Sequence, residues 1–278
     1  MLEGFERPSF DDSGWESIDL PASWEGLGKG TPIYVNAGWT FPKDNPPHVP
    51  LSSATASARP GWTTISEPNP TARLRRNFDL PDDWSGREVC LWIGAAQAAL
   101  AVWCNGTFVG FSQGSTDAAE FDLTPYVREK GNVLAFQVFK YAAGTYLEDH
   151  DAWRVSGIYR EVFLYSVPKS HIADVTLSSD IDAKRISAAV AIANPPEGGK
   201  VEFSAAGVTE SKSADRRVDV SVCSGSFPEW NPESPSLVHA RVVLRNASGE
   251  ILDIRHFRTA LCLTSPYKPY SLPLYLGQ

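Results

Sequence analysis

The densest cluster of chemically capable groups is a run of three carboxylates in the stretch 146–154: Glu148, Asp149 and Asp151. Carboxylate oxygens accept hydrogen bonds from hydroxyl groups, and they are the ligands that hard cations prefer. Three carboxylates in four residues are nevertheless more often a solvated acidic loop than a ligand site. Asn45 offers an amide that both donates and accepts, although Asn before Pro-Pro is usually a turn former.

Other reactive patterns are missing from the sequence. It contains no nucleophile elbow of a Ser/His/Asp hydrolase, no glycine-rich phosphate loop and no His/Cys metal cluster. The four cysteines are far apart and form no C-x-x-C pair, so we expect buried, reduced thiols at Cys90, Cys104, Cys223 and Cys262. No other motif competes with the loops as a site.

Charge and hydropathy exclude several classes of protein. The 278 residues include 25 Lys and Arg against 33 Asp and Glu, a net charge of −8, which argues against nucleic acid as a partner. The longest apolar run, residues 89–104, is shorter than the about 20 residues that a membrane helix needs. The N-terminus shows no secretory signal pattern. Together with the unpaired cysteines, this predicts a cytoplasmic protein that binds no membrane.

The elements that must position the polar loops are short β-strands. Apolar runs separated by turn signals predict strands over 72–80, 88–94, 98–104, 107–113, 133–141 and 160–165. Asn105-Gly106 lies between two of these runs and predicts a type I′ hairpin, since that turn needs positive φ at both positions. Residues 133–141 are apolar on both faces, which is typical of a central strand.

From about residue 170 the strands alternate cleanly between apolar and polar residues. The alternating sets are Ile186 to Ile192, Val201 to Phe203, Val218 to Val222 and Val238 to Leu244. We therefore predict an all-β protein with a jelly-roll β-sandwich over 1–168 and an immunoglobulin-like β-sandwich over 169–262. The tail 263–278 is expected to be irregular, and the Ser/Ala-rich stretch 51–65 is assigned no element.

A series of loop motifs, in this order, carries a resemblance to a known family. The motifs are Asp11-Asp-Ser-Gly-Trp15, Leu20-Pro-Ala-Ser-Trp24, Thr31-Pro-Ile-Tyr-Val-Asn36, Asn45-Pro-Pro-His-Val-Pro50, Asn69-Pro70, Trp103-Cys-Asn-Gly-Thr-Phe-Val-Gly110, Ala119-Glu-Phe-Asp-Leu123, Tyr146-Leu-Glu-Asp-His-Asp-Ala-Trp-Arg154 and Ser156-Gly-Ile-Tyr-Arg160. Over roughly residues 5–262 the chain resembles the N-terminal half of the lactase-type β-galactosidases of glycoside hydrolase family 2.

The resemblance implies that sugar binding and catalysis lie on different domains of a longer enzyme. Members of the family begin with a jelly-roll sugar-binding domain and an immunoglobulin-like domain, and continue into a (β/α)₈ barrel that carries both catalytic glutamates of a retaining mechanism. A barrel takes about 250 residues, and the resemblance ends near residue 258. We therefore expect no catalytic residue on this chain, no activity from the chain alone, and a barrel domain or fragment as its partner. A homo-oligomer is implied only for the complete enzyme.

The resemblance also assigns two site residues. Asp151 matches the family aspartate that contacts the galactosyl hydroxyls and helps to hold a monovalent cation, usually Na⁺. Asn45 matches an asparagine that hydrogen-bonds the same sugar. The family's Mg²⁺ ligands lie on the barrel, so no divalent site is expected here. Glu148 and Asp149 are expected to be structural.

Three functional interpretations stay open. The chain is the non-catalytic half of a β-galactosidase, a free-standing carbohydrate-binding module without hydrolase activity, or a gene fragment without a role of its own. Related enzymes hydrolyse glucuronides or mannosides, but Asn45-Pro-Pro and Tyr146-Leu-Glu-Asp favour a galactoside.

Overall fold

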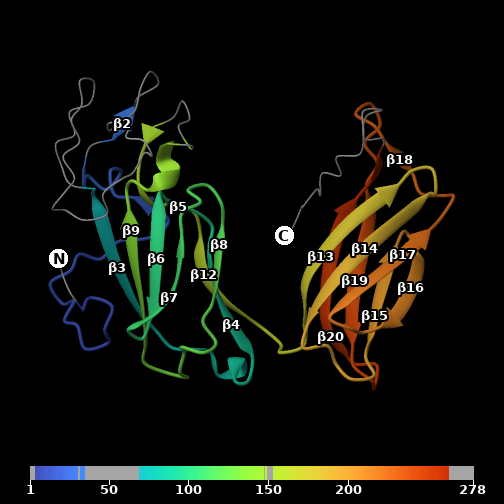
Figure 1. Ribbon diagram of the computed structural model, residues 1–278, viewed down its shortest axis with the longest axis horizontal. Helices are drawn as coiled ribbons and strands as arrows, with labels where there is room; N and C mark the ends of the chain where they lie inside the picture. The colour runs from blue at the N-terminus through green and yellow to red at the C-terminus, as the bar shows by residue number, and fades with distance from the viewer. Residues whose placement is uncertain (1–3, 31, 35–68, 147, 149–152, 263–278) are drawn as a thin grey trace. The chain divides into compact units, whose positions relative to one another are not determined.

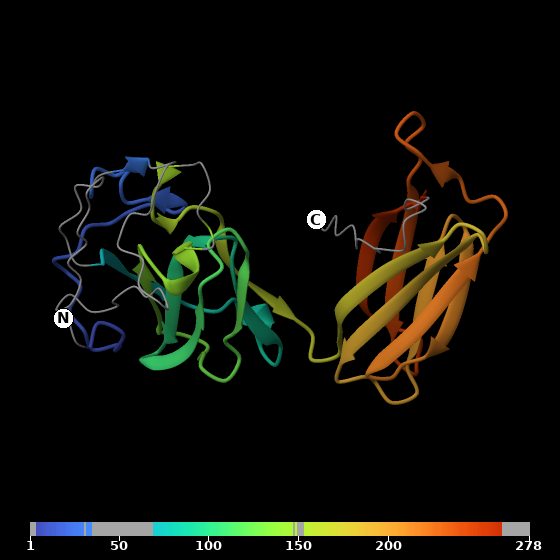
Figure 2. The same ribbon diagram turned by 45° about the horizontal axis from the view of Figure 1, so that its top comes forward.

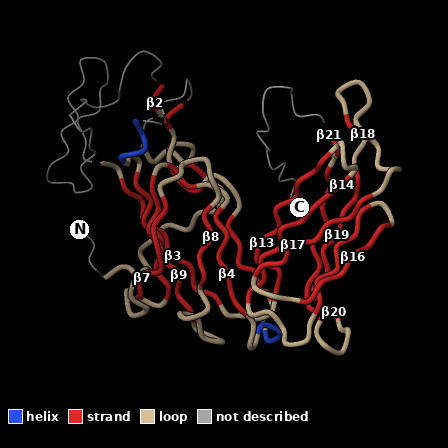
Figure 3. Tube along the Cα trace, turned by 45° about the vertical axis from the view of Figure 1, so that its right-hand side comes forward, coloured by secondary structure: helices blue, strands red, loops and turns tan. Residues whose placement is uncertain are grey.

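The computed structural model describes residues 4–30, 32–34, 69–146, 148 and 153–262. These residues form β-strands and two short 3₁₀ helices, η1 (Asp82–Trp84) and η2 (Ala143–Tyr146), as Figure 3 shows. The predicted all-β fold is confirmed. The chain divides into two compact units, residues 1–167 and 168–278. None of the helices in the described ranges has the length and hydropathy needed to cross a bilayer.

The first unit is a sandwich of two antiparallel sheets (Figure 1). One has the order β3-β9-β6-β7, formed by β3 (Thr71–Phe78), β9 (Asn132–Phe139), β6 (Ala99–Cys104) and β7 (Thr107–Ser112). The other has the order β12-β4-β8, formed by β12 (Val162–Val167), β4 (Glu88–Ile93) and β8 (Ala119–Asp122).

The core of this sandwich follows from strand alternation. Every second residue of β4 is buried, and these side chains meet Leu100 of β6 and Phe136 of β9. β9 pairs with β3 on one side and β6 on the other, and seven of its eight residues are buried. The prediction of a central strand over 133–141 is therefore confirmed.

The predicted hairpin joins β6 to β7. Asn105 and Gly106 have φ values of +53° and +84°, as a type I′ turn requires. The Asn105 amide donates to the carbonyl of Tyr126 at 2.8 Å and to Oδ1 of Asn132 at 2.9 Å. The turn is thereby fastened to the loop between β8 and β9.

Five strands of only two residues each complete the first unit. β1 (Ala22–Ser23), β11 (Gly157–Ile158) and β5 (Ala96–Gln97) form one small sheet in the order β1-β11-β5. β2 (Ile33–Tyr34) and β10 (Trp153–Arg154) form the other, which lies at the upper end of this unit in Figure 2. They join the N-terminal segment to the residues just before β12.

The second unit is a sandwich of three and four strands, the immunoglobulin-like arrangement that the sequence predicts. The three-stranded sheet has the order β13-β14-β17, formed by β13 (His171–Asp180), β14 (Arg185–Ala193) and β17 (Arg217–Cys223). The four-stranded sheet has the order β16-β15-β19-β20, formed by β16 (Val208–Ser213), β15 (Lys200–Ala205), β19 (Val238–Arg245) and β20 (Ile251–Thr259). A short parallel pair joins β18 (Glu229–Trp230) to β21 (Leu261–Cys262).

The alternating residues of the second unit form its core. The predicted inward sets from β14, β15, β17 and β19 are all buried and belong to one cluster around Phe203. Because the inward face is continuous and apolar, the residues between these positions lie on the outer faces of the two sheets.

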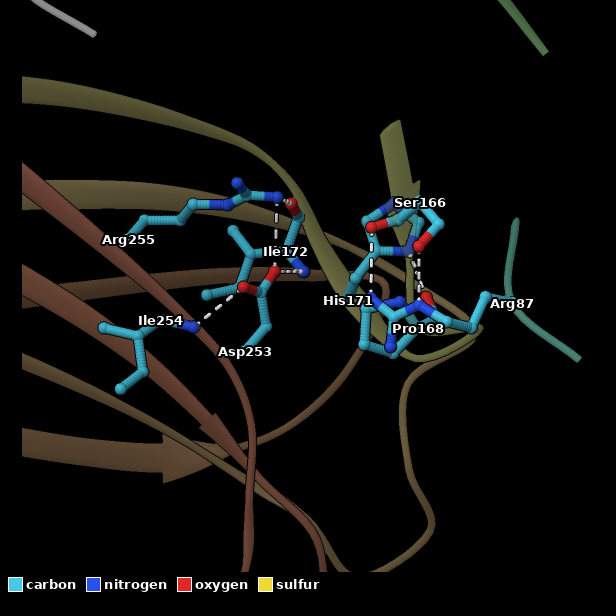
Figure 4. Close-up of polar contacts among 8 residues, drawn as sticks. All are labelled: Arg87, Ser166, Pro168, His171, Ile172, Asp253, Ile254 and Arg255. Carbon is cyan, nitrogen blue, oxygen red and sulfur yellow. Dashed lines mark hydrogen bonds and ion pairs between the residues drawn. The ribbon is translucent and has the colours of Figure 1, made fainter. Parts of the chain in front are cut away.

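The strands on either side of the unit boundary are fastened by side chains (Figure 4). In the first unit, Arg87 donates to the hydroxyl of Ser166 at 2.7 Å and to its carbonyl at 3.0 Å. In the second, Asp253 accepts a hydrogen bond from the backbone N–H of Ile172 at 2.9 Å and lies 3.3 Å from the Arg255 guanidinium. Each strand is therefore anchored within its own unit.

The cysteines differ in their exposure. Cys104 is fully buried in the first core, and burial raises the pKa of its thiol to about 11. Cys90 is half-buried, and burial also raises its pKa. Cys223 is exposed, so the expectation of a buried thiol is wrong there: at the end of β17 its side chain falls on the outward phase of the strand.

This difference predicts selective alkylation. At pH 8.5 a thiol with the raised pKa of Cys104 is only roughly 0.3% thiolate, the form that reacts. Iodoacetamide at this pH is therefore expected to modify Cys223 and to leave Cys104 unmodified, as measured by peptide mass spectrometry. The same reaction in urea serves as the control and should modify both. Equal rates for the two thiols in the folded chain would contradict the burial of Cys104.

Candidate functional site

The two predicted site residues, Asn45 and Asp151, lie outside the described residues, as does Asp149. The stretches that contain them, 35–68 and 149–152, adjoin Tyr34 and Trp153 in the chain. These two residues are direct partners in the small sheet of β2 and β10. The two stretches are therefore covalently attached to neighbouring positions of one sheet. We call the described residues around the Tyr34–Trp153 pair the frame of the site.

Two exposed aromatic side chains mark the frame. The ring centroids of Tyr34 and Trp153 are 5.7 Å apart with an angle of 47° between the ring planes. Trp153 is 62% exposed and Tyr34 46% exposed. Aromatic rings beside polar groups are typical linings of small-molecule sites, because their faces stack on the apolar face of a ligand ring. The pair supplies such a surface.

β10 places opposite kinds of side chain on its two faces. Trp153 faces solvent, whereas Arg154 is 6% exposed. Burial lowers the pKa of the Arg154 guanidinium. Because the ordinary pKa of arginine is far above neutral, the group nevertheless keeps its positive charge at physiological pH. A buried cation therefore underlies the aromatic surface.

A buried ion pair links the segments that carry the frame. Nζ of Lys140 lies 2.6 Å from Oε1 of Glu25, and the two side chains are 5% and 1% exposed. The second carboxylate oxygen of Glu25 accepts the backbone N–H of Ser156 at 2.8 Å, and the carbonyl of Ser156 accepts the N–H of Trp24 at 3.0 Å. Glu25 thus ties the N-terminal segment both to the end of β9 and to the residues between β10 and β11.

Asn69 fixes the chain that follows Lys140. Its amide donates to the carbonyl of Tyr141 at 2.9 Å and its Oδ1 accepts the Tyr141 N–H at 3.0 Å. The side chain thereby imitates a strand partner at a position where β9 has ended. The backbone N–H of Lys140 donates in addition to the carbonyl of Pro70 at 2.9 Å. Residues 140 and 141 are held by four hydrogen bonds or ion contacts of this kind.

Glu148 has the structural role that the sequence analysis expects. Its carboxylate accepts hydrogen bonds from the backbone N–H and the hydroxyl of Ser115, the first at 3.2 Å. Tyr159 donates its hydroxyl to the carbonyl of the same serine. Burial raises the pKa of Tyr159, so it remains a donor at neutral pH. Both flanks of the stretch 149–152 are therefore anchored.

The carboxylates of the frame serve its structure. The described carboxylates of the frame, Glu25 and Glu148, are both occupied by hydrogen bonds. No group of three His, Cys, Asp or Glu side chains in the described ranges is placed to hold a metal ion. The frame offers an aromatic surface and fixed attachment points for the two stretches.

A separate hollow of about 940 Å³ lies between the N-terminal segment and β3. Four of its charged side chains pair with one another. Arg75 lies 2.7 Å from Asp12 and donates to the carbonyl of Arg7 at 3.0 Å, and Lys29 lies 2.5 Å from Glu16. These contacts fasten the N-terminal segment to the sandwich, so we assign this hollow a structural role.

The sequence analysis missed Glu25, Lys140, Ser115 and Tyr34 as parts of the frame. Glu25 and Lys140 are 115 residues apart, and neither carries a local signal of burial. Two signals were available in the sequence: the motif Thr31–Asn36, which contains Tyr34, and Asn69-Pro70, a polar residue directly before the first long strand.

Comparison with known proteins gives three findings. The sequence profile described as "Glycosyl hydrolases family 2, sugar binding domain" matches residues 10–168. The β-galactosidase of Psychromonas ingrahamii is 31% identical over 272 residues, covering 88% of this chain and 24% of that protein, and the β-galactosidase of Priestia megaterium is 30% identical over 275 residues, covering 91% and 25%. A calcium-binding mutant of Bacteroides uniformis β-glucuronidase 2 superposes with a TM-score of 0.70 at 21% identity, over 94% of this chain and 31% of that one. The chain thus spans about a quarter of the length of these curated relatives.

Proposed function

The chain belongs to glycosyl hydrolase family 2, and from this premise we propose that it is the N-terminal, sugar-binding portion of a β-galactosidase, an enzyme that hydrolyses terminal non-reducing β-D-galactose residues. The observation that carries the proposal is that similarity to β-galactosidases runs through both units. Likeness to β-glucuronidase structures concerns the fold and does not select the sugar.

In this proposal the chain forms one rim of the galactose pocket. Asn45 and Asp151 hydrogen-bond the sugar hydroxyls, because an amide and a carboxylate together supply donors and acceptors. The Tyr34–Trp153 pair offers an apolar surface beside them. The acid/base and nucleophile glutamates belong to a (β/α)₈ barrel, the proposed partner, since a retaining mechanism needs two carboxyl groups about 5–5.5 Å apart. A homo-oligomer is proposed only for the complete enzyme.

The ligands of the proposed cation are likewise divided between this chain and its partner. Asp151 would supply a carboxylate oxygen to Na⁺, a hard cation, which would orient the sugar hydroxyls when bound. The other ligands would come from the partner, because the described residues hold no cluster of ligands. The Mg²⁺ of the family is assigned to the barrel.

The experiment that tests the function is complementation. The purified chain alone is expected to leave a chromogenic β-galactoside intact, whereas the chain mixed with a barrel-containing C-terminal fragment of a related β-galactosidase is expected to hydrolyse it. Loss of half the pocket costs most of the binding contacts, since useful affinity requires most of the ligand to be buried. Hydrolysis by the chain alone, or silence of a mixture shown to associate, would contradict the proposal.

Variants locate the contribution of the rim. Asp151→Asn is expected to lower turnover of the complemented mixture by about 100-fold or more, because a charged hydrogen bond to the reacting sugar is lost. Asp182→Asn, which changes an exposed turn carboxylate of the second unit, is the matched control and should leave turnover unchanged. Equal effects of the two substitutions would argue against a role for Asp151.

A free-standing carbohydrate-binding module is the second candidate. The exposed Tyr34 and Trp153 favour it, because an aromatic surface can bind sugar without a barrel. Calorimetric titration of the isolated chain with galactose or lactose distinguishes the two. Sub-millimolar binding would favour the module, and absence of binding at millimolar sugar would favour the half-pocket.

We propose the cytoplasm as the compartment. The three cysteines whose side chains are described are free thiols, which is the usual state in a reducing compartment.

A further inference from the structure

A row of hydrogen-bond donors crosses the outer face of the four-stranded sheet in the second unit. Thr209 of β16, Ser204 of β15, Arg241 of β19 and His256 of β20 are successive partners across the sheet. Strand alternation turns them away from the core, because the residues next to them, such as Ala240, are buried. Two hydroxyls, a guanidinium and an imidazole therefore stand in one line on the solvent side.

A second basic pair lies beside this row. His239 of β19 is the direct partner of Arg258 of β20, two residues along each strand from Arg241 and His256 and therefore on the same face. Side chains directly opposite in an antiparallel sheet have Cβ atoms about 4.5–5.5 Å apart, and like charges in such pairs are destabilising. Histidine opposite arginine occurs here twice in succession.

The four basic side chains have no counter-ion among the described residues. Within the described part of the second unit, His239, Arg241, His256 and Arg258 make no side-chain hydrogen bond or ion pair. Each is exposed. A chain of net charge −8 thus keeps an uncompensated basic cluster in one place, although Coulomb repulsion within the cluster opposes it.

The neighbouring carboxylates are directed elsewhere. Glu202, on the same face of β15, lies 3.0 Å from Nε of Arg245 and is neutralised by it. Glu210 of β16 is the partner of Phe203, whose side chain belongs to the core, and so lies on the opposite face of the sheet. The charge facing the two histidines from the described strands is therefore positive.

The cluster also surrounds a shallow hollow. Ser204, Thr209, His239, Arg241 and His256 line a depression of about 250 Å³, together with residues of the turn between β15 and β16. This volume exceeds the about 30 Å³ that one water molecule occupies in the liquid. A small ligand can therefore enter among the donors and need not rest on a flat surface.

We propose that this hollow binds a tetrahedral oxyanion of the phosphate type. The Arg241 guanidinium offers two parallel N–H groups to two oxygens of the anion. His239 and His256 donate from their ring N–H groups, and the hydroxyls of Ser204 and Thr209 complete the donor set. The anion balances the positive charge of Arg241. The site lies on the second unit and is independent of the sugar rim, so either proposal can fail without the other.

The test uses inorganic phosphate as the probe and the histidines as reporters. In the full chain labelled with ¹³C-histidine, phosphate at pH 6 is expected to shift the ring signals of His239 and His256 with a dissociation constant in the millimolar range. His171, whose ring lies 2.8 Å from the carbonyl of Pro168, is the internal control and should not shift.

Variants and competing anions decide the outcome. Arg241→Gln is expected to weaken phosphate binding at least about fivefold, since the paired charged hydrogen bonds are lost. Arg217→Gln changes an exposed arginine on β17 of the other sheet and should leave binding unchanged. The proposal is overturned if phosphate moves neither reporter, or if acetate at equal ionic strength moves both as far. It is likewise overturned if a glutamate-rich peptide binds where phosphate does not.

Discussion

Gly157→Ala is expected to cost the first unit about 3 kcal/mol or more of unfolding free energy, although it adds a single methyl group. Gly157 has a φ of +137°, which side chains rarely tolerate. A Cβ there would press into the carbonyl oxygen of Ala22 and lie 3.0 Å from Cα of Ser23. Both residues belong to β1, the direct partner of β11. The substitution must therefore separate the two strands.

Gly86→Ala is the matched control for this prediction. Gly86 also has a positive φ, +75°, but a Cβ there meets nothing within 4 Å, so only the backbone cost of about 1–2 kcal/mol applies. Urea unfolding followed by tryptophan fluorescence measures both variants, because eight of the nine tryptophans precede residue 168. If the two variants unfold at the same urea concentration, the close approach of β1 to Gly157 is wrong.

Lys140→Met is expected to destabilise the first unit by about 3–5 kcal/mol, because it leaves a buried carboxylate without its cation. Glu25 is 7% exposed, and after the substitution its oxygens keep the N–H of Ser156 as a donor. Desolvation of the charge is then no longer compensated. The measurement is again the urea midpoint followed by tryptophan fluorescence.

The control for the buried Glu25–Lys140 pair is an exposed ion pair. Lys29 and Glu16 lie 2.5 Å apart with side chains 55% and 65% exposed, so Lys29→Met should change stability by no more than about 1 kcal/mol. The double variant Glu25→Gln/Lys140→Met removes both charges and keeps an acceptor for Ser156, and it should recover part of the loss. A double variant less stable than Lys140→Met alone would show that the buried charge was not the cause.

The long strands could be predicted from the sequence because each carries its signal locally. Asn105-Gly106 fixes a hairpin by backbone sterics, and the alternation from Ile186 to Ile192 fixes the buried face of β14. The strand over 160–165 was predicted two residues early, since β12 spans Val162–Val167. The apolar pattern identifies a strand better than its ends.

The short strands could not be predicted in the same way. A two-residue strand such as β1 or β11 has no periodicity, and it forms because distant segments meet. The pairing of Ala22 with Ile158 depends on the finished sandwich, whose packing no local pattern describes. The glycine of Ser156-Gly157-Ile158 was visible as a motif, but its positive φ and its contact with β1 were not.

The candidate site shows the same limit. Asn45 and Asp151 were found through loop motifs and remain predictions, since both lie outside the described residues. The frame around them depends on Glu25 and Lys140, which look like surface residues in the sequence. The basic residues of the second unit lie at the outward positions of the alternating strands. Alternation predicts which residues are buried, but it does not predict which outward residues of β19 and β20 are paired, because that depends on the register of the two strands.

The hydrogen bond between Ser156 and Glu25 has a consequence for synthesis of the chain on the ribosome. The two residues are 131 positions apart, so at a translation rate of about 5–20 residues per second Ser156 emerges on the order of 10 s after Glu25. During that time β1, β2 and the charge of Glu25 have no native partners. β1 pairs with β11 and β2 with β10, so these N-terminal strands are among the first made but meet their partners only after residues 153–158 have left the exit tunnel.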